Sequence, residues 1–160
     1  MSSKGQTELT ALAKRVFNSL YSLDRDMHNE VLKSCYDTKA VFENPFVYIE
    51  GIEDIRRHFD SFNRFFSTFE ASILSISESK LFNNSVVLVD QVIKSRVYFV
   101  PLEVRCVTRL EVNERGKIVR HEDIWSLKDL MASFPVVGWM YGNVMRRVLS
   151  AISVRVLGYK

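Results

Sequence analysis

The sequence predicts an α+β domain in which helices come first and a long antiparallel sheet follows. Apolar residues recur every three or four positions up to Phe66, as they do on one face of a helix. From about Phe69 they alternate with polar residues instead, which is the period of a β-strand. The 160 residues, of which 47% are hydrophobic and 26% charged, are enough for one ordinary domain with a sizeable core.

Three helices are expected in the first part of the chain. The first covers residues 7–21, whose apolar positions form one stripe. The second begins after Asp24 or Asp26, because either side chain is a suitable N-cap. The third begins at Gly51, and its apolar positions continue at helical spacing to Phe66.

Strands account for most of the remaining domain. A short strand ends at Pro45, since proline lacks the amide hydrogen that a sheet needs. Residues 86–93 are apolar on both faces apart from two polar positions, which is typical of a central strand. Residues 104–112 alternate between an apolar and a charged face, so one side packs on a core. Residues 113–116 predict a hairpin turn, and residues 117–127 form the returning strand.

A separate C-terminal segment, residues 131–160, is predicted to follow a domain of residues 1–130. Its apolar positions recur at helical spacing, and it carries Arg146, Arg147 and Arg155. A basic amphipathic helix of this kind predicts peripheral contact with an anionic membrane or with a protein partner. Packing of the same helix across the sheet is the alternative.

Composition argues against several classes of protein. Cys35 and Cys106 lie in separate apolar runs, so both are expected to be reduced core thiols. The histidines are scattered, with His28 and His58 expected in solvent, so neither a metal site nor a cofactor is predicted. Positive charge does not cover the domain as it does in nucleic-acid-binding proteins. The first residues contain no hydrophobic signal segment, which favours a cytoplasmic protein.

Two stretches of the chain carry a resemblance to a known family. Residues 35–46 read Cys-Tyr-Asp-Thr-Lys-Ala-Val-Phe-Glu-Asn-Pro-Phe and lead to a helix that starts at Gly51. The second stretch comprises Arg109 and Leu110, a turn ending in glycine and a strand that closes at Trp125. Together they resemble the nuclear transport factor 2-like superfamily, which includes ketosteroid isomerases, SnoaL-like polyketide cyclases and scytalone dehydratases. Within it the chain looks nearest to an uncharacterised eukaryotic branch.

The resemblance implies a cone of curved antiparallel sheet whose wide end is closed by the N-terminal helices around an apolar pocket. It places Tyr21, Asn44, Phe59, Thr108 and Trp125 at this pocket. The general base of the isomerases falls on Asn44, which accepts no proton at neutral pH, and their hydrogen-bonding acid falls on Thr108. Steroid isomerisation by that mechanism is therefore not expected.

His121 and Asp123 are the remaining candidates for chemistry. The resemblance implies that both point into the pocket from the last strand, two positions apart. Alternation alone leaves the facing of this strand open, because Ile118 competes with Trp125 for the core. Side chains of this kind serve as acid and base in a lyase or isomerase. A hydrogen-bonded polar pair without a catalytic role is the alternative.

Three functions are compatible with the sequence. The first is a module that binds a small hydrophobic molecule without chemistry, which the replaced isomerase groups favour. The second is a lyase or isomerase of a small hydrophobic substrate that uses His121 and Asp123. The third is an interaction module that docks through the C-terminal helix. A homodimer formed through a sheet face that carries Val87, Val89 and Ile93 is compatible with the sequence as well.

Overall fold

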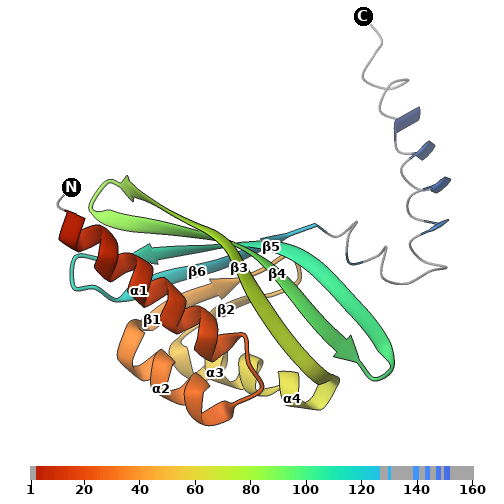
Figure 1. Cartoon of the computed structure of the whole chain (residues 1–160), viewed down its shortest axis with the longest axis horizontal. Helices are drawn as coiled ribbons and strands as arrows, with labels where there is room; N and C mark the ends of the chain where they lie inside the picture. Colours follow the sequence, from red (N-terminus) through yellow and green to blue (C-terminus); the bar gives the residue numbers. More distant parts are fainter. Residues whose placement is uncertain are drawn as a thin grey trace, which may run out of the picture.

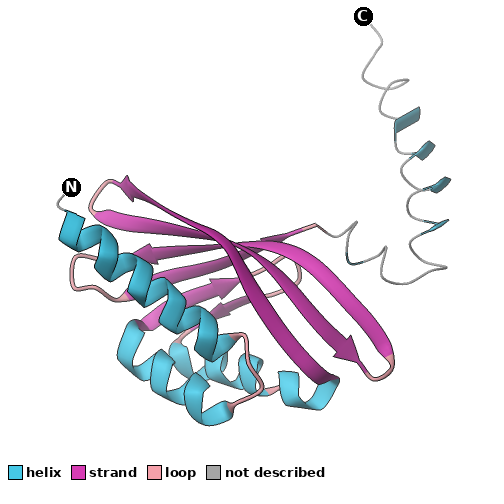
Figure 2. Cartoon of the chain, viewed as in Figure 1, coloured by secondary structure: helices cyan, strands magenta, loops and turns pink. Residues whose placement is uncertain are grey.

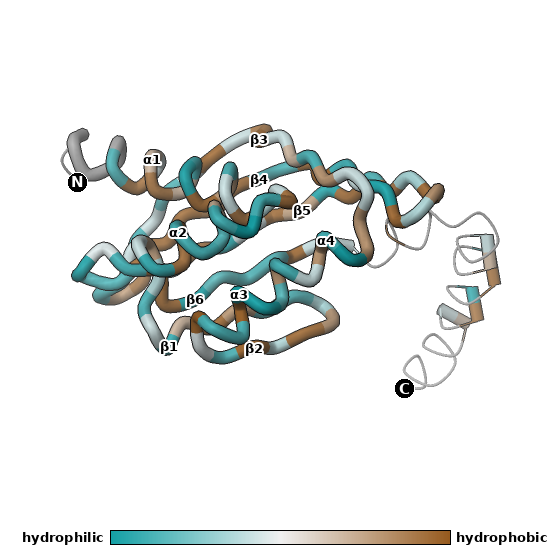
Figure 3. The backbone as a smooth tube through the Cα atoms, turned by 90° about the horizontal axis from the view of Figure 1, so that it is seen from below, coloured by the Kyte–Doolittle hydropathy of each residue, from teal (hydrophilic) through white to brown (hydrophobic). Residues whose placement is uncertain are grey.

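A curved sheet with helices gathered on one side forms the body of the protein (Figure 1). The computed structural model describes residues 3–126 and, beyond them, residues 130, 139–140, 143–144, 147–148 and 150–151. Helices and strands both mix hydrophobic and hydrophilic residues, as expected for elements with one buried and one exposed side (Figure 3). The α+β class is thus confirmed.

The helical part begins with two long helices. These are α1 (Ser3–Leu20) and α2 (Arg25–Cys35). The Asp24 side chain accepts hydrogen bonds from the backbone amides of Asp26, at 2.9 Å, and Met27, at 3.2 Å. Asp24 is therefore the N-cap of α2, as its position in the sequence predicts.

The third predicted helix is divided in two. Gly51, with a φ of 86°, leads into α3 (Ile52–Asp60), and a single turn, α4 (Phe62–Phe65), follows. At the break, the Ser61 hydroxyl donates to the backbone carbonyl of His58 at 2.6 Å. The expectation of one helix up to Phe66 is wrong, because this local hydrogen bond accompanies a break and Phe66 already belongs to a strand.

The strands form one sheet in the described part of the chain, in the order β2-β1-β6-β5-β4-β3 (Figure 2). They are β1 (Tyr36–Glu43), β2 (Tyr48–Glu50), β3 (Phe66–Leu81), β4 (Asn84–Val97), β5 (Val100–Val112) and β6 (Ile118–Trp125). Neighbouring strands are antiparallel except for β1 and β6, which are parallel. The predicted hairpin is confirmed between β5 and β6, where Gly116 has a φ of 73°.

A β-bulge sets the facing of β6. On β5, Glu111 and Val112 are adjacent. Their partners on β6, Arg120 and Ile118, are two positions apart, so β6 contains one extra residue between these pairs. Ile118 and His121 are three positions apart and yet both fully buried. The bulge therefore lets both residues face the helices, which simple alternation does not allow.

The hydrophobic core lies between the helices and the sheet. Its fully buried large apolar side chains come from helices and strands alike: Leu20, Val16, Val31, Leu32, Phe42, Ile55, Phe59, Leu110 and Ile118. Val87 and Val89 also belong to this core, with 0% and 1% of their surface exposed. The expectation that they form an exposed dimer face is therefore wrong, because α1 packs on β3 and β4 at this place. Cys35 and Cys106 are buried free thiols, as predicted.

The predicted C-terminal helix, residues 131–160, lies mostly outside the described residues, and so do Arg146 and Arg155. Residues 139–140, 147–148 and 150–151 are helical and exposed, Arg147 among them. None of the helices among the described residues has the length and hydropathy required to span a membrane. The boundary at residue 130 and the contact with a membrane or partner stay predictions.

Candidate functional site

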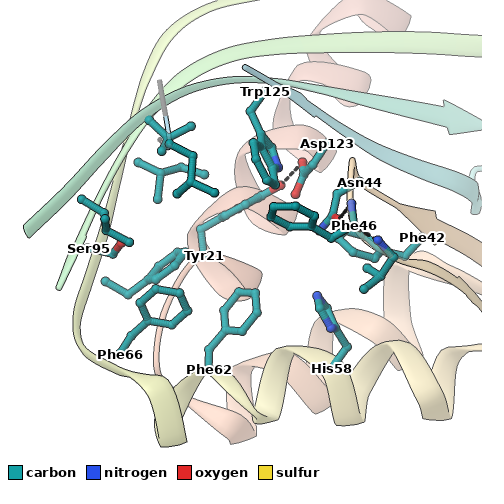
Figure 4. Close-up of a pocket in the computed structure, with 16 residues that line it drawn as sticks. Tyr21, Phe42, Asn44, Phe46, His58, Phe62, Phe66, Ser95, Asp123 and Trp125 are labelled. Atoms are coloured by element: carbon teal, nitrogen blue, oxygen red, sulfur yellow. Dashed lines mark hydrogen bonds between the residues drawn. The ribbon is translucent and has the colours of Figure 1, made fainter. Parts of the chain in front are cut away.

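A partly enclosed cavity of about 300 Å³ lies between the sheet and the helices (Figure 4). Its wall is built from segments that lie between the end of α1 and residue 130. The lining residues are Tyr21, Phe42, Asn44, Phe46, Val47, His58, Phe62, Phe66, Phe69, Ile93, Ser95, Leu102, Val104, Asp123, Trp125 and Leu130. The cavity has the size and apolar lining of a small-molecule site.

Aromatic rings make up much of the wall. Phe62, Phe66 and Phe69 pack on one another with ring centroids 5.2 to 5.4 Å apart. Elsewhere on the wall, the rings of Phe46 and Trp125 meet edge to face at 4.9 Å. Such aromatic pairs contribute free energy in addition to that of the area they bury, so their packing stabilises the shape of the wall.

The Asp123 carboxylate is the polar centre of the cavity wall. Its Oδ1 atom accepts hydrogen bonds from the hydroxyls of Tyr21 and Thr108. Tyr21 comes directly after α1, and Thr108 is the residue of β5 that pairs with Asp123. Figure 4 shows Tyr21 reaching across the cavity toward the carboxylate. The end of the first helix is thereby tied to the middle of the sheet.

His121 extends this cluster away from the cavity. Its Nε2 atom lies 3.1 Å from Tyr21 Oη and 3.3 Å from Asp123 Oδ1, and its Nδ1 atom lies 2.7 Å from Tyr36 Oη. Gln91 Nε2 donates to Thr108 Oγ1 at 2.6 Å. His121 thus connects Tyr36 on β1 with Tyr21 and Asp123.

The cluster keeps its carboxylate ionised and its tyrosines protonated. Burial raises the pKa of Asp123, but the adjacent His121 and hydrogen bonds from His121, Thr108 and Tyr21 outweigh burial and hold this pKa below its usual value. Burial, followed by the charge of Asp123, raises the pKa of Tyr21 and of Tyr36 well above the usual value. At neutral pH the cavity wall therefore presents an ionised carboxylate that is held by His121 and by hydroxyl donors.

The sequence-predicted site residues divide into two groups. Tyr21, Asn44 and Trp125 line the cavity together with Asp123, although Asn44 also has a local role. Its Oδ1 accepts from the backbone amides of residues 46 and 47, at 2.8 and 3.0 Å, and so shapes the loop between β1 and β2.

Three predicted residues lie behind the wall instead. Thr108 and His121 are buried beneath Asp123 and do not line the cavity. Phe59 does not line it either, because its ring is enclosed by those of Phe42 and Phe62, with centroids 5.1 and 5.3 Å away. These three residues form the layer that supports the wall, and their predicted role in the site stays a prediction.

The sequence interpretation missed His58, which lines the cavity. Its Nε2 atom is buried and has no hydrogen-bond partner among the described residues, and burial lowers the pKa of its imidazole. Its spacing from Ile55 and Phe62 places it on the apolar side of the helical region, a signal the sequence does contain. His28 is buried too, and it contacts Asp60 at 3.1 Å. The expectation of two solvated histidines is therefore wrong.

The family of the chain follows from comparison with known sequences. Residues 15–121 match the SnoaL-like domain, and the chain belongs to this family. Its α+β architecture is that of the wider nuclear transport factor 2-like superfamily. No curated protein matches the sequence significantly. Among the described residues, no group of three or more His, Cys, Asp or Glu side chains is arranged to hold a metal ion.

Solved structures of differently named proteins share this fold. A LEH-like epoxide hydrolase from Mycobacterium tuberculosis is similar over 79% of this chain and 84% of that one, with 19% identity and a TM-score of 0.65. AusH from Aspergillus nidulans is similar over 76% and 85%, with 16% identity and a TM-score of 0.61. An NTF2-like protein of unknown function from Exiguobacterium is similar over 72% and 98%, with 11% identity and a TM-score of 0.62. At these sequence identities, the similarity shows a shared fold alone.

Replacing Asp123 tests the cluster through its pH dependence. We expect Asp123→Asn to lower the free energy of unfolding at pH 7 by about 1–3 kcal/mol, because two buried hydroxyls lose a charged acceptor. The pKa of Asp123 is lower in the folded protein than the value of about 3.9 in the unfolded chain. The extra free energy of unfolding of the wild type is therefore complete above about pH 3.9, and it is lost as the pH falls through the pKa of the folded protein. Urea unfolding at pH 7 and pH 3 measures the difference.

Asp90→Asn is the matched control, since Asp90 pairs with the exposed Arg105 on the sheet surface. Its effect at pH 7 should be clearly smaller. A loss for Asp123→Asn that is equal at both pH values would contradict the assignment of an ionised, hydrogen-bonded carboxylate.

His58 gives a second stability prediction. Because burial lowers the pKa of its imidazole, the unfolded chain takes up a proton at His58 more readily than the folded protein does. The wild type should therefore lose stability relative to His58→Leu as pH falls from 8 to 5.5, through the usual histidine value of about 6.5. Parallel urea titrations of both proteins measure it, and a difference that does not change with pH would show that His58 is solvated.

Proposed function

We propose that the protein binds a small molecule with an apolar body and one polar group in the cavity between its helices and its sheet. The observation that carries this proposal is an aromatic-walled cavity of about 300 Å³ with a single carboxylate, that of Asp123, in its wall. An apolar body gains free energy from contact with the rings, and a placed polar group sets its orientation.

The chemistry of Asp123 defines the polar group of the ligand. An ionised carboxylate only accepts hydrogen bonds, and its two oxygens offer about four acceptor sites. Tyr21 and Thr108 both donate to Oδ1, which leaves acceptor sites for a ligand. The ligand therefore carries a hydrogen-bond donor on an otherwise apolar frame. His58 Nε2 offers a second polar contact on the cavity wall.

Binding is better supported than acid–base catalysis by His121 and Asp123. His121 is fully buried and does not line the cavity, so it has no direct contact with a molecule held there. Its hydrogen bonds instead orient Asp123 and Tyr21. Assignment to a eukaryotic branch of the superfamily is a finer proposal, and it rests on the resemblance of the segment after Leu127.

Filling the cavity tests the proposal. Ile93 lines the cavity, whereas Ile124 is 47% exposed on the last strand and does not line it. We expect Ile93→Phe to weaken binding of 1-adamantanol by about tenfold, because the larger side chain occupies ligand space. Ile124→Phe, the matched control, should bind like the wild type. Isothermal titration calorimetry measures each affinity, with thermal unfolding as a check on folding.

Two results would contradict the proposal: no measurable affinity of the wild type for any adamantane derivative, whether neutral or charged, or equal losses in both variants. Native mass spectrometry of the purified protein adds an independent measurement. A co-purified hydrophobic molecule that is released by Ile93→Phe but retained by Ile124→Phe would support binding within the cavity.

A further inference from the structure

One carboxylate is the charged group in the described lining of the cavity. Of the described residues that line it, Asp123 is the single acidic one, and none is a lysine or arginine. The other polar side chains on this wall are Tyr21, Asn44, His58 and Ser95. Burial lowers the pKa of His58, so this imidazole is neutral at pH 7 and does not compensate the carboxylate.

Behind the cavity wall, Asp123 is held by two hydroxyls and by His121, whose Nε2 atom lies 3.3 Å from Oδ1. Tyr21 and Thr108 are hydroxyl donors. Tyr36 has His121 Nδ1 as its hydrogen-bond partner among the described residues, at 2.7 Å, and its raised pKa keeps its hydroxyl protonated. This hydrogen bond fixes the orientation of the imidazole behind Asp123.

The arginines on the neighbouring strands face other carboxylates. Arg105 contacts Asp90 at 2.6 Å, on the sheet surface. Arg120 forms an ion pair with Glu43. Arg109, the residue directly after Thr108, contacts Glu111 at 2.6 Å and Glu122 at 3.3 Å. No lysine or arginine of the described lining faces Asp123 in the cavity, so the ammonium group of a ligand can contact this carboxylate there.

The remaining wall also suits a cation. Tyr21, Phe62, Phe69 and Trp125 are among the aromatic residues around the cavity. The face of an aromatic ring carries partial negative charge and attracts ammonium groups, most strongly where water is excluded. A ring-lined space that contains one carboxylate thus combines both features that recognise alkylated ammonium groups.

From this arrangement we propose that the ligand is a cation, namely an amine with apolar substituents. Its charged nitrogen contacts the Asp123 carboxylate, and its substituents lie against the aromatic wall. The inference rests on the proposed function, since it specifies the class of molecule that the cavity binds. It also predicts discrimination: a neutral molecule of the same shape forms no ion pair with the carboxylate, and an anion is repelled.

Three compounds with one carbon frame and different charges test the inference. At pH 7, 1-adamantylamine is a cation, 1-adamantanol is neutral and adamantane-1-carboxylate is an anion. For the full-length protein we expect the amine to bind at least about tenfold more tightly than the alcohol, as for a hydrogen bond between charged groups. The carboxylate should bind most weakly. Isothermal titration calorimetry gives the three affinities under identical conditions.

Two variants locate the preference. Asp123→Asn should abolish the advantage of the amine over the alcohol, because the negative charge is removed while the cavity keeps its shape. Phe62→Leu, which tests the ring without altering the carboxylate cluster, should reduce the affinity for the amine about threefold more than that for the alcohol. Phe65→Leu is its control, because Phe65 is exposed on the same helix and does not line the cavity.

The outcomes separate this inference from the proposed function. Equal affinities of the wild type for amine and alcohol would overturn the inference alone, since the cavity would still bind an apolar body. An amine preference that persists in Asp123→Asn and in Phe62→Leu would overturn it too, because the cation would then bind elsewhere. Failure of all three compounds to bind would contradict both proposals.

Discussion

The hydrogen bonds that converge on Asp123 are the interaction on which the rest of this structure depends. They join the end of α1, through Tyr21, to two strands of the sheet, through Thr108 and Asp123 itself. His121 and Tyr36 extend the cluster to β1. In a buried region each such group is costly when unpaired, so the members hold one another in place. The cavity lies beside this junction, and its shape follows from where α1 is tied to the sheet.

The same cluster explains how an apolar cavity keeps a charge. The adjacent His121 and the hydrogen bonds from His121, Thr108 and Tyr21 favour the ionised carboxylate despite its burial. Asn44 stands at the position of the isomerase base in the resemblance described above, and here its side chain caps the loop that carries part of the wall. The site is therefore organised around acceptance of a hydrogen bond by Asp123, with His121 as a positioning residue behind it.

Much of the fold was predictable, because local signals and tertiary structure agree at Asp24, at Gly116 and along the alternating residues of β5. The site was predictable only in part. The extra residue in β6 shifts the facing of His121 relative to Ile118, and a bulge leaves no clear pattern in one sequence. Phe59 faces the core, not the cavity, although both environments are apolar. His58 was recognisable from its helical spacing, but its polar side chain favoured a solvent position.

A crystal structure of the protein with 1-adamantylamine tests the central claim most directly. The account predicts that the compound lies in the cavity with its nitrogen about 3 Å from an Asp123 carboxylate oxygen. It also predicts that Tyr21 and Thr108 keep their hydrogen bonds to Oδ1. Electron density for the amine only on the outer surface, or a cavity filled by side chains in the crystal, would contradict the account.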